Sequence, residues 1–265
     1  MKKFKCLLNC GIVFLLISLL PVFGCSALKY EDFTIGYLNY RFYRDRPSEA
    51  MVVDLTQKGF EEANEIVIPP YADGKIVKSI GVTQYIGSSH LWSRIMESVY
   101  IPYTIDGVVR ECIGHNSEKL SKIVVSSNKL MKHLEQKNGT LYFFSENVKY
   151  YITSLATNDE KIKYQMLNAW SNFNILPANV SFMFNYNGSP NDDYFYIDNF
   201  GYGEKIMTPP YCPVREGYEF GGWYKESECI NKWDFKTDTL PQAQFDDEEQ
   251  EIYQETKLYA KWIKI

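Results

Sequence analysis

A degenerate repeat is the feature that most limits how this 265-residue chain can fold. In two units an Ile-Gly pair begins fourteen positions after the first apolar residue. These units are Ile66-Val67-Ile68-Pro69 with Ile80-Gly81, and Val99-Tyr100-Ile101-Pro102 with Ile113-Gly114. Shorter apolar runs begin at residues 123 and 141, so successive units start 33, 24 and 18 residues apart. Residues two apart on a strand share a face, and proline ends a strand without needing an amide donor. Because one unit cannot bury its own apolar face, the pattern predicts a stack of strands with one continuous core.

These units resemble the leucine-rich repeats of the BspA-like group of bacterial surface proteins, whose strands end in Ile-Pro before a Val-x-x-Ile-Gly step. The stretch from Leu38 to Ile66 is similar to the lead-in of that group, and the stretch from Tyr164 to Ile175 to its closing helix and strand. The resemblance implies a mainly β fold for residues 25–177, namely a short irregular leucine-rich-repeat solenoid with an N-terminal lead-in and a C-terminal helical cap. One departure is that the third strand ends in Ser126 instead of proline.

Residues 178–265 carry the pattern of a small aromatic β domain. Apolar residues alternate with others from Val180 to Tyr186, and Asn187-Gly188 then predicts a turn, so this strand is expected to enter a hairpin or a loop. Aromatic side chains that each bury roughly 150–250 Å² are expected to form the core of this domain. The expected core residues are Phe220, Trp223, Trp233, Phe235 and Trp262, and Leu258 and Ala260 share a buried face with Trp262. We expect an independent module, with a protease-sensitive junction near Leu176–Asn179.

The order Arg-Glu-Gly-Tyr-x-Phe-x-Gly-Trp-Tyr at 215–224, Trp-Asp-Phe at 233–235 and Leu-Tyr-Ala-Lys-Trp at 258–262 resembles the Listeria-Bacteroides repeat, the module known from the internalin B-repeat. The resemblance implies a β-grasp-like domain of surface proteins that serves as a spacer or interaction module. Two insertions depart from the repeat, one rich in Asn and Asp between residues 188 and 198, and one between residues 240 and 255. The second contains Asp246-Asp247-Glu248-Glu249, which is typical of a solvated loop; a cation site is the alternative.

The N-terminus has the features of a secretory leader. Lys2, Lys3 and Lys5 precede an apolar run from Ile12 to Leu20, which is too short to span a membrane. Val22-Phe23-Gly24-Cys25 then resembles the bacterial lipobox. The resemblance implies a lipoprotein signal peptide at residues 1–24 and lipid attachment at Cys25, which would anchor the chain to a membrane at the bacterial cell envelope or cell surface. An ordinary signal peptide or an uncleaved anchor is the alternative.

The other cysteines leave one pairing open. Cys6 and Cys10 belong to the leader, so Cys112, Cys212 and Cys229 remain beside the lipidated residue. An exported chain meets an oxidising compartment, which makes a disulfide between Cys212 and Cys229 possible. Free buried thiols are the equal alternative.

Charge and motif content exclude several functions. The net charge of −5 becomes −8 once the three leader lysines are removed, and without a basic tract we expect no nucleic-acid partner. Cys112 and His115 have a Cys-x-x-His spacing but lack a second ligand pair, so we expect no metal and no cofactor. Phosphate loops, nucleophile elbows and zinc-protease motifs are absent from the sequence. Asp192 and Asp193 alone do not define a glycosidase pair.

The sequence therefore favours a cell-envelope lipoprotein that acts without catalysis, in adhesion or ligand binding through protein–protein contacts. Recognition would use an exposed strand face and aromatic-rich loops, since Tyr and Trp are favoured at interfaces. The alternatives are a polysaccharide-binding accessory lipoprotein, a hydrolase with an unrecognised site, and a spacer without a ligand. A protein or glycan ligand outside the cell is the expected partner.

Overall fold

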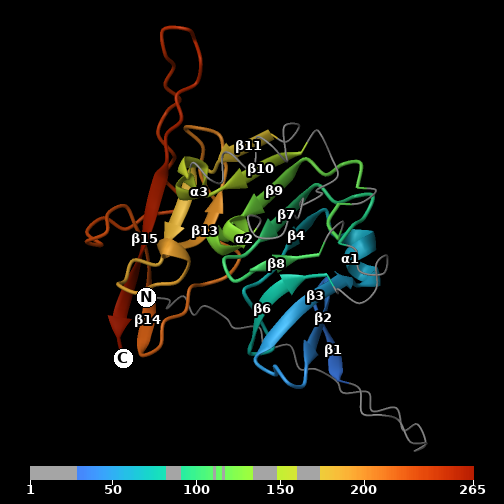
Figure 1. Ribbon diagram of the computed structural model, residues 1–265. Coiled ribbons are helices and arrows are strands. Elements are labelled where there is room, and N and C mark those ends of the chain that lie inside the picture. Colours follow the sequence, from blue (N-terminus) through green and yellow to red (C-terminus); the bar gives the residue numbers. More distant parts are fainter. Residues whose placement is uncertain (1–28, 82–90, 110–111, 115–116, 134–147, 160–173) are drawn as a thin grey trace, which may run out of the picture.

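The computed structural model describes residues 29–81, 91–109, 112–114, 117–133, 148–159 and 174–265. Within these residues the chain is mainly β and forms three sheets, which we call the N-terminal, parallel and C-terminal sheets (Figure 1). The predicted signal peptide, Cys25, the apolar run at 141–143 and the stretch from Tyr164 to Phe173 lie outside the described residues. No helix among the described residues is long and apolar enough to cross a bilayer.

The N-terminal sheet begins with an antiparallel meander and continues as a mixed sheet, in which β6 is parallel to β3 and β8 and antiparallel to β5. Its strands, in sheet order, are β1 (Tyr30–Ile35), β2 (Leu38–Tyr43), β3 (Glu49–Leu55), β6 (Lys75–Ile80) and β5 (Tyr71–Ala72), with β8 (Gly107–Val108) also paired to β6. Helix α1 (Gln57–Glu62) follows β3 and starts where the Thr56 side chain accepts a hydrogen bond from the Gly59 amide, which satisfies one of the unpaired amides of its first turn.

The parallel sheet is built from the repeat. Its strands, all parallel and in sequence order, are β4 (Glu65–Val67), β7 (Ser98–Ile101), β9 (Lys122–Val125), β10 (Lys149–Ile152) and β11 (Asn174–Pro177). Their starts are 33, 24, 27 and 25 residues apart. The strands predicted at residues 66, 99, 123 and 175 are confirmed. Strand β10 was not predicted, because it has two tyrosines at its centre and its Ile152 is followed by Thr153, without the Ile-Pro of the first two units. Two short helices, α2 (Asn128–His133) and α3 (Ser154–Asn158), follow β9 and β10.

The register aligns apolar side chains across this sheet. Ile66 pairs with Val99, which pairs with Ile123. Ile101 lies two residues further along β7 than Val99 and pairs with Val125, so it does not share the row of Ile66 and Ile123, although all belong to one core. That first core fills the space between the N-terminal and parallel sheets.

The C-terminal sheet contains, in order, β13 (Tyr194–Asp198), β12 (Val180–Met183), β15 (Thr256–Lys264) and β14 (Tyr218–Tyr224), and a 3-10 turn, η1 (Asn191–Asp193), precedes β13. The predicted strand from Val180 is confirmed, but it ends at Met183, and residues 184–193, with a turn at Asn187-Gly188, connect it to the antiparallel β13. Trp223 and Trp233 are buried as expected, whereas Phe220, Phe235 and Trp262 are half-buried and pack against the same core.

The C-terminal module, residues 178–265, shares its core with the parallel sheet. This second core includes Tyr100, Val124 and Tyr151, whose side chains point to the face of the parallel sheet opposite the first core. The junction is buried too: Ala178 is fully covered, and its amide donates to the Ile152 carbonyl at 2.9 Å. The expectation of an independent module with an exposed junction is therefore wrong, because the aromatic core extends across both modules.

Candidate functional site

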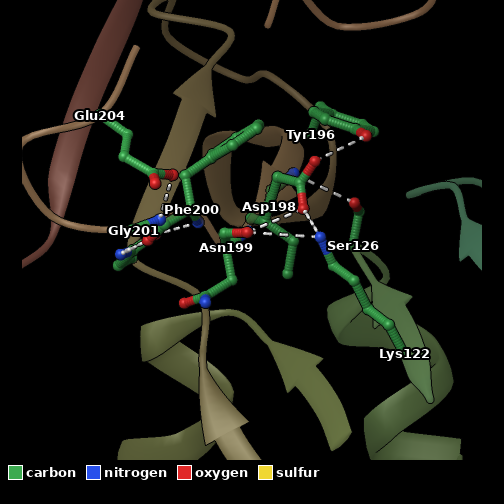
Figure 2. Close-up of polar contacts among 10 residues, drawn as sticks. Lys122, Ser126, Tyr196, Asp198, Asn199, Phe200, Gly201 and Glu204 are labelled. Carbon is green, nitrogen blue, oxygen red and sulfur yellow. Dashed lines mark hydrogen bonds and ion pairs between the residues drawn. The ribbon is translucent and has the colours of Figure 1, made fainter. Parts of the chain in front are cut away.

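An ion pair between a half-buried lysine and a buried aspartate joins the two modules where β9 begins and β13 ends (Figure 2). The Lys122 ammonium donates to the Asp198 carboxylate and, at 3.3 Å, to the Asn199 carbonyl. Asp198 is only 3% exposed, and it also accepts from the Asn199 amide at 2.7 Å and from the Tyr196 hydroxyl at 3.4 Å. Hydrogen bonds from several donors are what allow a carboxylate to remain inside a protein.

Aromatic rings surround the same ammonium group. The Lys122 Nζ lies 5.3 Å from the ring centroid of Tyr100, and 5.8 Å from those of Tyr151 and Phe200. The negative faces of aromatic rings attract a cation at such distances. Burial raises the pKa of Asp198, and the Lys122 charge partly opposes that shift. The Lys122–Asp198 pair thus lies among apolar side chains at the junction, where it fixes the orientation of one module against the other.

The Asn- and Asp-rich insertion forms a second set of junction contacts. Asn191 donates to the Ser126 carbonyl at 2.6 Å and accepts from the Asn128 amide at 2.8 Å. The φ angles of Asn191, Asp192 and Asp193 are 56°, 53° and 75°, a left-handed turn that Asn and Asp tolerate better than other side chains. Ser126 also accepts from the Ile197 amide through its hydroxyl at 3.3 Å. Ser126 and the insertion between residues 188 and 198, which both depart from the repeat patterns, therefore make contacts between the two modules.

Asp192 and Asp193, the two neighbouring carboxylates noted in the sequence, are part of this turn. Asp193 accepts from the Asn185 amide at 2.9 Å and from the Ser189 hydroxyl at 2.6 Å. Asp192 accepts from the Asn128 side chain at 3.2 Å. The Asp192 bond ties the loop to the N-terminal module, residues 29–177, whereas the Asp193 bonds shape the loop itself.

A serine and glutamate cluster makes the third junction contact. Ser154 donates to Glu255 at 2.8 Å across the junction, and Ser181 donates to the other oxygen of the same carboxylate at 2.6 Å. Lys257 lies 3.5 Å from Glu255. Both serines are buried, and their hydrogen bonds to Glu255 link the two modules.

The C-terminal module covers one face of the parallel sheet. This face of the parallel sheet cannot be the exposed strand face expected for recognition, because Tyr100, Val124 and Tyr151 are buried under the C-terminal module. The second insertion, residues 240–255, instead forms an arm that projects from the body (Figure 1, red loop at the top). Its two sides are held together by a β-bridge between Phe245 and Glu251 and by the Ile252 amide, which donates to the Gln244 carbonyl at 2.8 Å.

The arm combines exposed apolar side chains with negative charge. Phe245 is 60% exposed, and Ile252 and Tyr253 are exposed as well. The run from Asp246 to Glu249 is exposed, and the Asp246 carboxylate accepts from the amides of Glu248 and Gln250, both at 2.9 Å. These bonds shape the tip of the arm. Among the described residues no group of three or more acidic, His or Cys side chains is placed to hold a metal ion.

The three cysteines in the described residues differ in their burial. Neither Cys212, which is exposed, nor Cys229, which is half-buried, takes part in a disulfide among the residues that the structure describes. Cys229 donates to the carbonyls of Ser227 and Ala260 at 3.6 and 3.7 Å. Burial raises the pKa of Cys112 to about 12, so its thiol stays protonated and packs in the first core. His90 and His115 lie outside the described residues, and His133 ends α2.

Comparison with known proteins identifies the C-terminal module. Residues 179–261 match the Listeria-Bacteroides repeat domain, as the sequence predicted. A "Putative Gly-rich membrane protein" of Evansella cellulosilytica is 39% identical over 61 residues, which cover 23% of this chain and 6% of that protein. "Internalin H" of Listeria monocytogenes is 43% identical over 37 residues, 14% of this chain and 7% of that protein. The chain thus matches less than a tenth of the length of either relative.

Proposed function

We propose that this protein is a lipoprotein of the bacterial cell envelope that binds an extracellular protein without catalysis. The N-terminal module is proposed to be a short leucine-rich repeat of the BspA-like type, supported by its five parallel strands in register. The C-terminal module is proposed to be a β-grasp-like repeat. Its matches to a membrane protein and to an internalin support a location at the cell surface.

The projecting arm carries the proposal. Association needs apolar area that is exposed before binding, and Phe245 and Ile252 present such area on the arm. Tyr253 adds exposed ring surface at the base of the arm, where its hydroxyl donates to the Ala178 carbonyl at 2.8 Å. The neighbouring carboxylates would steer a partner with a basic surface and raise the association rate at low salt. Because the shared core and the ion pair fix the two modules together, the arm stands on a rigid base, which lowers the entropy lost on binding.

We expect the arm to account for binding to extracellular proteins. The purified mature chain is tested against immobilised fibronectin, laminin, collagen and fibrinogen. Phe245→Ser, combined with amide replacement of Asp247, Glu248 and Glu249, is expected to weaken binding about tenfold. Asp246 is kept because it shapes the tip. Surface plasmon resonance at low and high salt measures the loss.

Val214→Ser is the matched control for that experiment, because Val214 is exposed on the same module but lies outside the arm. It should bind as the unmodified chain does. Equal binding by the arm variant, or no dependence on salt, would count against the arm as the recognition element.

We expect Cys25→Ala to release the protein from membranes. Lipid on this cysteine would supply the anchor, since each buried methylene contributes about 0.8 kcal/mol and several chains are needed for stable attachment. Fractionation of cells expressing the variant, with circular dichroism of the soluble product, measures attachment and folding separately. Continued sedimentation of the variant with membranes would rule out the lipobox interpretation.

A further inference from the structure

A depression of about 300 Å³ opens on the N-terminal sheet, on the face that points away from the first core. Its volume lies at the lower end for small-molecule sites, enough for one ring of a larger ligand. The polar lining comes from β3, β6 and the loops beside them, with Tyr43 at the end of β2. The lining includes Tyr43, Arg46, Glu49, Met51, Lys78 and Asp106.

Two loose ion pairs line the depression. Arg46 and Glu49 are 3.9 Å apart, and Lys78 and Asp106 are 3.5 Å apart. Both separations exceed the 2.7–3.2 Å of an N–H···O hydrogen bond, so a small hydroxyl group can accept from one partner and donate to the other. Within the lining two cations face two carboxylates, and Lys129, from outside the lining, also donates to Asp106 at 2.9 Å.

Rigid apolar surface lies beside these groups. The Tyr43 ring packs edge-on against Tyr30, with centroids 6.3 Å apart, and the Arg46 guanidinium lies 5.4 Å from its centroid. Tyr30 is in turn covered by Arg41, which forms two hydrogen bonds with Asp32 at 2.6 and 2.8 Å. Side chains fixed in this way present a prepared surface.

We propose that this depression binds one ring of a neutral saccharide. Sugar rings carry C–H groups on one face and hydroxyl groups around the edge. Tyr43 and Met51 would contact the apolar face, and the two ion pairs would exchange hydrogen bonds with vicinal hydroxyls. This goes beyond the proposed protein-binding arm, since it concerns a different ligand and a different module.

Titration of the mature chain with maltotriose, cellotriose and chitotriose, followed by saturation-transfer NMR, tests the proposal. At least one trisaccharide should bind saturably with a dissociation constant in the millimolar range, about 1 mM. Tyr43→Ala and Glu49→Gln should each weaken that binding about tenfold. Tyr71→Ala, at an exposed tyrosine outside the depression, should bind as the unmodified chain does.

Two results would overturn the proposal. One is the absence of saturable binding of all three sugars up to about 20 mM by the folded chain. The other is unchanged binding by both Tyr43→Ala and Glu49→Gln with circular dichroism unaltered. The arm variant described above should retain its sugar binding, which keeps the two proposals separable.

Discussion

Lys122→Met should destabilise the whole chain by about 3–5 kcal/mol, because it leaves the buried Asp198 carboxylate without its cation. Urea unfolding followed by tryptophan fluorescence measures the loss. Lys225→Met is the matched control, since the Lys225–Asp238 pair at 2.8 Å is partly exposed and such pairs contribute about 1 kcal/mol or less. A loss for Lys122→Met no larger than that of the control would show that the junction does not depend on this ion pair.

The loss should depend on pH in a defined direction. In the unfolded chain Asp198 ionises near its ordinary pKa of 3.8, whereas burial raises the folded pKa, and removal of Lys122 raises it further. Between the two pKa values the folded variant therefore holds more protons than the unfolded chain. Stability then falls as the pH rises through this interval. The deficit of Lys122→Met relative to the unmodified chain should be smallest near pH 4 and grow toward neutral pH.

Val124→Asp should cost more than about 4 kcal/mol and separate the two modules, because it places a carboxylate in the shared second core. The same substitution at Val214, which is 73% exposed, should change stability by about 0.5 kcal/mol or less. The comparison holds the chemistry of the substitution constant and changes only its burial.

Limited proteolysis provides a second measurement for this variant. In the unmodified chain, cleavage between residues 177 and 179 should be slow, since Ala178 and Asn179 are buried. Val124→Asp should expose this junction and make it the first site of cleavage. Equal resistance in both proteins, together with unchanged stability, would mean that the modules do not depend on the shared core.

The strands of this protein are encoded locally. Alternation of apolar residues from Ile66 to Ile68 and from Val180 to Tyr186, with proline and Asn-Gly at the ends, was enough to predict strands β4 and β12 and the turn after β12. The aromatic signature at 215–262 was enough to predict the matched repeat domain. A period-two pattern depends only on residues that are close in the sequence, so it predicts a strand without knowledge of the tertiary fold.

The location of the exposed surfaces could not be predicted in this way. Alternation shows that Val124 points away from Ile123, but it does not show whether solvent or another module covers that side. The candidate depression likewise needs β2, β3, β6 and a distant loop to be placed together.

Sequence by itself determined the strand pattern, the C-terminal repeat and the exclusion of common catalytic motifs. Only the tertiary structure decided that the outward face of the parallel sheet is buried. The physical reason is that Lys122 meets Asp198, and Ser126 meets Asn191, across more than sixty residues of chain. Such contacts stabilise the fold through burial and charge pairing between segments whose local sequences carry no sign of each other.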